Sequence, residues 1–154
     1  MQRTPITRPG YENLKKELDR MIKIERPANV KAIKAARAHG DIMENAEYHA
    51  AKDRQSFIEG RIAELQVQIG ECDIIDTSQV HDRAVFGARI TLEDSETGEQ
   101  KSYMLVGPYE SDPEKGRISV TSPLGRALIG KEEGDEVRVK APGGVQEMEI
   151  VEIR

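Results

Sequence analysis

The fold is decided by the stretch Arg-Ala-His-Gly-Asp-Ile-Met-Glu-Asn-Ala-Glu-Tyr-His-Ala-Ala, residues 37–51. It interrupts a long helical pattern with a single glycine, Gly40, and then places Asp41, Glu44 and Glu47 within seven residues. A glycine at this point suits the left-handed residue just past a helix end. The stretch therefore predicts a turn that joins two helices and carries three acids.

Helical patterns flank this turn on both sides. The apolar residues before it recur at the three- and four-residue spacing of one helix face: Leu14, Leu18, Met21 and Ile22. Beyond Pro27, which kinks or resets a helix, apolar positions resume at Val30 and Ile33. The apolar residues after the turn repeat at 4-3-4-3, as in a coiled-coil seam: Ile58, Ile62, Leu65, Ile69 and Cys72. Two helices joined by one short turn form an antiparallel hairpin, with the acidic turn at its tip.

The ends of these helices have recognisable signals. Thr7, followed by Pro9 and Gly10, precedes a first helix that we expect over residues 11–39, roughly 40 Å long at 1.5 Å per residue. Asp41 and Glu44 have the spacing of a capping box, so we expect the second helix to begin at Asp41.

The C-terminal half has a different pattern. Five short runs alternate apolar and polar residues with the period of a β-strand: residues 85–92, 102–106, 117–121, 136–140 and 145–153. Ser122 and Pro123 predict the N-cap and first position of one short helix over residues 124–129. The chain is therefore predicted to be α+β, with a coiled-coil hairpin over residues 1–78 and a small antiparallel sheet domain over residues 79–154.

Composition narrows the class of protein. The net charge of -5 is concentrated in residues 81–154, which carry 10 basic and 15 acidic residues, so wrapping of duplex DNA is not expected. No run approaches the roughly 20 apolar residues of a membrane span, and no secretory signal is visible. A lone cysteine fits a reducing compartment. We therefore expect a cytoplasmic protein with no membrane partner.

The acids of the tip have several readings. A capping box alone would account for Asp41 and Glu44, and Glu47 would then complement the helix dipole. A zinc site could use His39, Asp41, Glu44 and His49, but these residues lack the usual two-histidine helical spacing. Magnesium prefers carboxylate oxygens, although two exposed carboxylates would hold it weakly. They would matter when inserted into another site that already holds the metal.

A basic stripe precedes the tip. Lys31, Lys34 and Arg37 recur every third residue, and no acid lies between Arg26 and Gly40. The stripe is either a solvated helix face or a set of phosphate contacts close to the acidic turn.

Two long motifs resemble a known family. The segment Gly-Asp-Ile-Met-Glu-Asn-Ala-Glu-Tyr-His-Ala-Ala-Lys (residues 40–52) and the segment Ser-Pro-Leu-Gly-Arg-Ala-Leu-Ile-Gly-Lys (residues 122–131) are similar to those of the bacterial Gre transcript-cleavage factors, of the GreA type. The resemblance covers essentially the whole chain, including the position of Pro27. The continuation after the tip and the acidic balance favour the GreA type over the more basic GreB type.

The resemblance implies both a fold and a function. It implies a coiled coil that enters the secondary channel of RNA polymerase and an FKBP-like domain that docks at the channel rim. In this family the factor is not an enzyme alone. It has no cofactor of its own, and Mg²⁺ is held jointly with the polymerase, whose cleavage of backtracked nascent RNA the tip stimulates. By position, the resemblance makes Asp41 the metal ligand and Glu44 the helper of metal or water.

Two further roles follow from the resemblance. Arg37 and Lys52 are expected to contact the extruded RNA, and Ser122 and Pro123 to meet the polymerase rim. Free copies are expected to be monomeric, because the apolar seam gives way to alanine and charge towards the tip.

Rival functions remain open at the level of sequence. An FKBP-like prolyl isomerase would need an aromatic pocket, and residues 82–154 hold three aromatics, Phe86, Tyr103 and Tyr109. An inhibitory, non-cleaving homologue would carry extra acids at the tip, where this chain has Ile42 and Met43.

Overall fold

The computed structural model describes residues 3–79 and 81–154, and the chain divides into two compact units. One, the helical hairpin, comprises Tyr11–Glu71; the other, the sheet unit, comprises the residues up to Gly10 together with Cys72–Arg154. The predicted boundary after residue 78 differs from this division by seven residues. It also left the N-terminal segment with the hairpin, whereas that segment pairs with the sheet unit.

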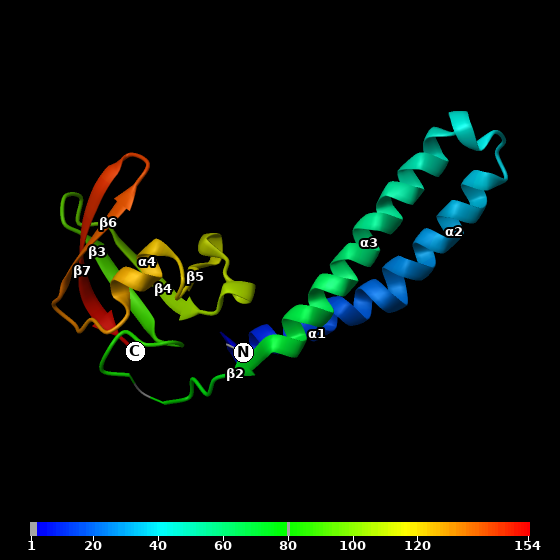
Figure 1. The fold of residues 1–154 in the computed structure, drawn as a ribbon. Coiled ribbons are helices and arrows are strands. Elements are labelled where there is room, and N and C mark those ends of the chain that lie inside the picture. The colour runs from blue at the N-terminus through cyan, green and yellow to red at the C-terminus, as the bar shows by residue number, and fades with distance from the viewer. Residues whose placement is uncertain (1–2, 80) are drawn as a thin grey trace. The chain divides into compact units, whose positions relative to one another are not determined.

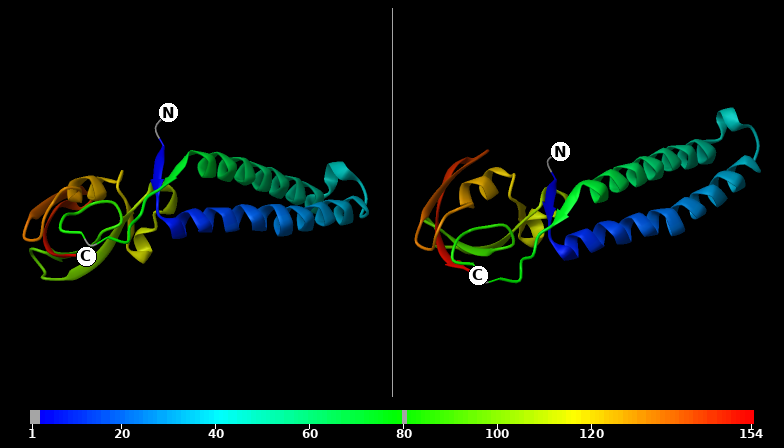
Figure 2. Two further views of the ribbon diagram at one scale, coloured as in Figure 1. Left: turned by 90° about the horizontal axis from the view of Figure 1, so that it is seen from below. Right: turned by 60° about the horizontal axis from the view of Figure 1, so that its bottom comes forward.

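The helical hairpin consists of two arms that lie side by side (Figures 1 and 2). The first arm contains α1 (Arg8–Arg20), a π-helical turn η1 (Met21–Glu25) and α2 (Arg26–Arg37). The second arm is the single helix α3 (Ala46–Glu71), and the short 3₁₀ turn η2 (Ile42–Glu44) lies between the arms. The predicted antiparallel hairpin with the acidic turn at its tip is confirmed.

The π-helical turn changes which residues of α2 face the second arm. A π turn takes in one residue more than an α turn, so the buried positions beyond it shift by one. Leu14 and Met21 are buried and lie seven residues apart. The same spacing would next bury positions 28 and 35, but the buried residues are Asn29 and Ala36. Val30, predicted as an apolar contact, is 43% exposed. Pro27 lies at the start of α2, directly after the π turn.

The predicted seam of α3 is largely correct. Ile58, Ile62 and Leu65 are buried, and Ile69 is half-buried. Cys72 is buried as well, but it opens strand β2 (Cys72–Ile74) of the sheet unit, so its assignment to the helical seam was wrong. Among the described residues, no helix is long and apolar enough to cross a membrane.

The sheet unit contains a curled five-stranded sheet with one short helix packed against it (Figure 1). Its strand order is β5-β4-β3-β7-β6, with the bounds β3 (Arg89–Asp94), β4 (Gln100–Val106), β5 (Arg117–Ser119), β6 (Glu136–Ala141) and β7 (Gly144–Ile153). All neighbours are antiparallel except β4 and β5, which run parallel. The 3₁₀ turns η3 (Pro108–Glu110) and η4 (Pro113–Lys115) lie in the connection that makes this parallel pairing possible.

The core of this unit lies between the sheet and α4 (Pro123–Leu128). Its fully buried side chains include Ile90, Leu92, Leu105, Leu128 and Ile150. The predicted α+β class, a helical hairpin followed by a small FKBP-like sheet domain with one short helix, is confirmed, but the sheet predicted to be antiparallel is mixed, because β4 and β5 run parallel.

A second, two-stranded sheet holds the N-terminal segment. Strand β1 (Thr4–Ile6) pairs in parallel with β2, which lies 68 residues further along the chain. The buried carboxylate of Glu110 accepts hydrogen bonds from the Thr7 backbone nitrogen (2.7 Å) and the Thr7 hydroxyl. The same hydroxyl accepts from the nitrogen of Gly10 (3.2 Å) at the start of α1, so Thr7 caps this helix as its sequence position suggested.

Candidate functional site

The acidic turn is held by its own backbone and by one carboxylate oxygen. Asp41 Oδ1 accepts a hydrogen bond from the nitrogen of Met43 (3.0 Å), which caps the 3₁₀ turn η2. Gly40 has φ of 130°, a conformation that L residues with a side chain rarely adopt. The second helix does not begin at Asp41. In a capping box the nitrogen of Glu44 would donate to Asp41, whereas here the donor is the nitrogen of Met43, one residue earlier. The predicted capping box was therefore wrong, although Asp41 is a cap.

Asn45 caps the second helix instead. Its Oδ1 accepts from the nitrogen of Tyr48 (3.0 Å), and α3 begins at the next residue, Ala46. Sequence reasoning missed Asn45 because Asp41 offered an equally good cap four residues earlier. Asparagine before a run of helix formers was the signal that could have found it.

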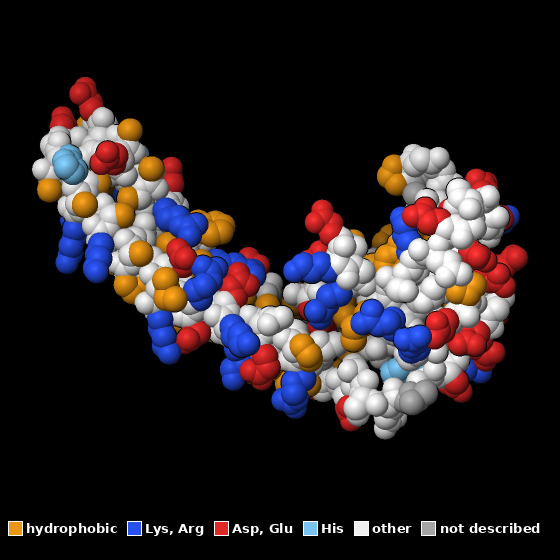
Figure 3. All heavy atoms as spheres, turned by 180° about the vertical axis from the view of Figure 1, so that it is seen from behind, with side chains coloured by type: hydrophobic (Ala, Val, Ile, Leu, Met, Phe, Trp, Pro, Cys, Tyr) orange, Lys and Arg blue, Asp and Glu red, His pale blue; other side chains and the backbone are white. Residues whose placement is uncertain are grey.

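The carboxylates of Asp41 and Glu44 face solvent. Both residues are exposed and share an open hollow with His39 and Glu47 (Figure 3 shows acidic side chains and a histidine at this end of the hairpin). Within residues 3–79 and 81–154, no ion pair involves these three acids. The tip therefore presents negative charge that no cationic side chain of the described residues neutralises.

The side chain of His49 contacts the backbone of the tip. Its Nε2 lies 3.3 Å from the carbonyl oxygen of Met43, and its ring lies edge-on to that of Tyr48, with centroids 5.7 Å apart. Across the described chain, no group of three or more His, Cys, Asp and Glu side chains is arranged to hold a metal. The alternative of a zinc site built from His39, Asp41, Glu44 and His49 thus has no support in the geometry.

The predicted RNA-contact residues lie on both sides of the tip. The guanidinium of Arg37, at the end of α2, lies over the ring of Tyr48, 5.8 Å from its centroid. Lys52 lies one helical turn after Tyr48 on α3, and its Nζ donates to Gln55 (2.8 Å). Both are exposed, as are Lys31 and Lys34 of the basic stripe.

Further along the arms, acids and arginines form ion pairs. Arg61 makes two bonds to Glu17 (both 2.8 Å), and Arg26 makes two to Glu59 (2.8 and 2.7 Å). Glu25 is paired with Arg20 (2.7 Å) and, across the arms, with Arg54 (3.0 Å). The hydrogen bonds from Arg61 and Arg26 hold the pKa values of the carboxyl groups of Glu17 and Glu59 below their usual range.

Ser122 and Pro123 occupy the predicted helix start in the sheet unit. The Ser122 hydroxyl donates to the carbonyl of Ser119 (2.6 Å) and accepts from the nitrogen of Gly125 (3.0 Å). Gly125 is required here, because an added Cβ would lie 2.0 Å from the same carbonyl. Pro123 is exposed. The two hydrogen bonds therefore hold the loop in this shape, and Pro123 is the more exposed residue of the pair.

The donor set of the tip suits a hard cation more than a soft one. Magnesium takes oxygen ligands and commonly binds through only one or two protein carboxylates, its other positions being filled by water or substrate. Asp41 Oδ2 and both oxygens of Glu44 meet that description, because no protein group among the described residues occupies them. Two carboxylates can contribute to a shared magnesium site, but they cannot complete one.

Comparison with known proteins is consistent for both halves of the chain. Residues 4–74 match the family model "Transcription elongation factor, N-terminal" and residues 79–154 match "Transcription elongation factor, GreA/GreB, C-term". The GreA protein of Syntrophobacter fumaroxidans is 57% identical over 100% of this chain and 99% of the relative. That of Thermodesulfovibrio yellowstonii is 56% identical over 98% of this chain and 96% of the relative.

Solved structures also match over nearly the whole length. GreA factor homolog 1 of Thermus thermophilus is 28% identical, with a TM-score of 0.46 and coverage of 99% of both chains. A GreA/GreB factor of Nitrosomonas europaea is 20% identical, with a TM-score of 0.44 and coverage of 99% of this chain and 98% of that one.

Proposed function

Because this chain belongs to the GreA/GreB family of transcription elongation factors, we propose that it acts on RNA polymerase by delivering its acidic tip to the polymerase active site. In this proposal the hairpin enters the secondary channel of the polymerase in the cytoplasm. It stimulates the magnesium-dependent cleavage of a backtracked transcript, and elongation resumes from the new 3′ end.

One observation carries the proposal: two exposed carboxylates with no ion-pair partner among the described residues, Asp41 and Glu44, on a capped turn at the end of two helical arms. A turn that only had to reverse the chain would need no such charge. Two antiparallel helices side by side make a projection about 20 Å wide, since each helix with its side chains is 10–12 Å across. Such a projection can carry the two groups into a channel.

The chemistry would be divided between the two proteins. Asp41 Oδ2 and the Glu44 carboxylate would contribute oxygen ligands or accept a hydrogen bond from the attacking water. A shared magnesium ion, when bound, supplies a positive charge that stabilises the developing charge at the reacting phosphate. Asp41 Oδ1 remains bonded to Met43, which fixes the orientation of the carboxylate.

Other exposed groups would serve binding. Arg37 and Lys52 would contact phosphates of the extruded RNA, because both lie on the arms directly below the acids. Pro123 would contact the polymerase rim, while Ser122 keeps its loop in shape through its two hydrogen bonds.

The decisive experiment uses a purified polymerase halted in a backtracked complex, with 3′-labelled RNA and magnesium. Adding the full chain should release short labelled 3′ fragments well above the rate of polymerase alone, and the chain should cut no RNA without polymerase. Absence of added cleavage, or inhibition of elongation without cleavage, would overturn the proposal in favour of an inhibitory homologue.

A further inference from the structure

The side chain of Asn45 joins the two arms at the tip. Its Nδ2 donates to the carbonyl oxygen of Ala36 in α2 (2.6 Å), while its Oδ1 accepts from the nitrogen of Tyr48 in α3 (3.0 Å). One amide thus connects the last turn of the first arm to the first turn of the second.

The backbone of Asn45 takes part in the same arrangement. Its nitrogen lies 3.4 Å from the carbonyl of Ile42, which it bonds to close the 3₁₀ turn, and its carbonyl accepts from the nitrogen of His49 (3.1 Å). Four hydrogen bonds therefore converge on one residue at the junction of α2, η2 and α3.

The loop that carries the acids runs between the two groups joined by this amide. Ala36 is only 2% exposed, and its carbonyl also accepts from the nitrogen of His39 (3.2 Å), so the Nδ2 bond ends on a packed position of the first arm. Asp41 and Glu44 lie between Ala36 and Asn45 in the chain, within the loop that the Nδ2 bond closes. Closing a loop at its base restricts the positions available to every residue within it.

We propose that Asn45 is a positioning residue for the carboxylates of Asp41 and Glu44, a role that rests on the proposed function of the tip. The Nδ2 bond to Ala36 fixes the base of the loop, and so holds the two carboxylates in the geometry needed to share a magnesium ion. Asn45 itself touches neither metal nor substrate.

The amide nitrogen separates this role from helix capping. Serine, aspartate and asparagine cap helices about equally well, because each offers an oxygen to the first-turn nitrogens. Asparagine alone among these has its donor on a separate nitrogen, one bond further from the backbone than a serine hydroxyl, so it can bond a carbonyl on the other arm while its oxygen caps the helix. Asn45→Ser therefore keeps the cap and removes the link to Ala36, whereas Asn45→Ala removes both.

The test measures cleavage by these two variants as a function of magnesium concentration. We expect Asn45→Ser to lower the cleavage rate about 10- to 100-fold at limiting magnesium, as for residues that orient metal ligands. The magnesium concentration that gives half-maximal cleavage should rise, and excess magnesium should restore part of the rate. Polymerase binding, measured by competition with labelled unmodified protein, should stay unchanged.

Asn29→Ser is the matched control. Asn29 also joins the arms, donating from Nδ2 to the carbonyl of Ala51 (3.0 Å), but it lies seven residues before Ala36, roughly 10 Å along the helix. This variant should lower the melting temperature and leave the magnesium midpoint unchanged, which separates loss of stability from loss of positioning.

The outcomes distinguish this role from the function on which it rests. If Asp41→Asn abolishes cleavage while Asn45→Ser keeps the unmodified rate and magnesium midpoint, Asn45 is only a cap and the positioning role is overturned. If Asp41→Asn itself cleaves like the unmodified protein, the proposed function of the tip is overturned as well. A shift of the midpoint in Asn45→Ser alone, without one in Asn29→Ser, supports the positioning role.

Discussion

Acidic residues on the arms of the helical hairpin differ from those at its tip in whether they form ion pairs. On the arms, carboxylates are matched by arginines, as in the pairs of Glu17 with Arg61 and Glu59 with Arg26. At the tip, Asp41 and Glu44 have no such partner within the described chain, although Arg37 and Lys52 lie nearby in sequence. Paired acids stabilise the projection, and unpaired acids remain available to a partner.

The cationic groups near the tip are engaged elsewhere, which keeps the acids free. Arg37 lies over Tyr48 and Lys52 bonds to Gln55, so neither forms an ion pair with the carboxylates. We therefore expect that the charge of the tip is not needed for folding.

The largest expected effect follows from removing the tip charges. Asp41→Asn and Glu44→Gln should each lower stimulated cleavage on the order of 100-fold, because loss of a metal ligand forfeits several kcal/mol of transition-state stabilisation. The melting temperature and the affinity for polymerase should change little. Cleavage is measured on a backtracked complex, and melting is followed by circular dichroism.

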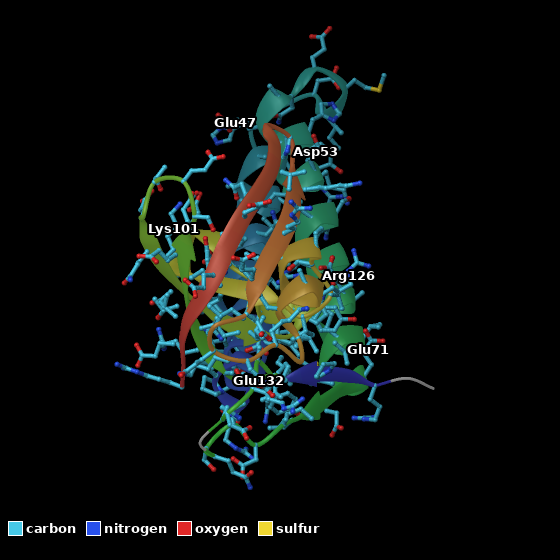
Figure 4. The ribbon with its side chains drawn as sticks, turned by 90° about the vertical axis from the view of Figure 1, so that its left-hand side faces the viewer. Glu47, Asp53, Glu71, Lys101, Arg126 and Glu132 are labelled. Atoms are coloured by element: carbon cyan, nitrogen blue, oxygen red, sulfur yellow. The ribbon has the colours of Figure 1, made fainter. Side chains whose placement is uncertain are left out.

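Asp53→Asn is the control for that loss. Asp53 is an exposed acid on α3, six residues after Glu47, and no ion pair of the described residues involves it (Figure 4 labels both). It should cleave at the unmodified rate. Equal losses in Asp53→Asn and Asp41→Asn would mean that total charge, and not the tip site, governs the activity.

A smaller effect is expected from giving the tip the partner it lacks. Met43 is 83% exposed and adjacent to Glu44, so Met43→Lys places an ammonium group within reach of the carboxylates. An exposed pair is worth at most about 1 kcal/mol, which predicts up to about a fivefold loss of cleavage. Met43→Gln is the neutral control, and the loss in Met43→Lys should diminish as salt is raised. Equal losses in both variants would assign the effect to Met43 itself.

On the arms we expect a change in stability without a change in cleavage. A double-mutant cycle of Glu17→Gln and Arg61→Gln should give a coupling free energy of about 0.5–1 kcal/mol in unfolding, measured by chemical denaturation. Cleavage per bound molecule should stay unchanged in all three variants. A loss of cleavage without a loss of stability would contradict the division between arms and tip.

The smallest expected effect is on folding stability at low pH. Arg61 lowers the pKa of Glu17 from the usual 4.5, so the stability from this pair is fully present above about pH 4.5. It is lost as pH falls through the lowered folded-state pKa. Between about pH 6 and about pH 3, the melting temperature of the unmodified protein should therefore fall further than that of Glu17→Gln. An identical pH dependence in both would show that the pair contributes nothing to folding.

The local signals in the sequence predicted much of the fold. Ser122 and Pro123 placed the start of α4 correctly, because a cap and the residue after it act within one turn. The period-two runs placed strands β3 to β7, with starts that differ by up to four residues. The parallel pairing of β4 with β5 was not predictable in this way, since it depends on the path of the connection through η3 and η4.

The residues of the candidate site also fall into those that local sequence signals predicted and those that they did not. Asp41 and Glu44 were found from their type, their spacing and their position in a turn between helical patterns. Asn45 was missed, and so was Asn29, which occupies a buried position where Val30 was expected. The π-helical turn shifted the face of α2 by one residue, and a periodic pattern carries no information about such a shift.

The sequence by itself determined the hairpin, its acidic turn and the short capped helix, because these depend on residues within a few positions of one another. Only the tertiary structure decided which groups meet across the arms: Asn45 with Ala36, Asn29 with Ala51, and Arg61 with Glu17. These contacts join residues 9 to 44 positions apart. The physical reason is that a hydrogen bond or ion pair between distant residues exists only once the chain has folded back and fixed the register of one helix against the other.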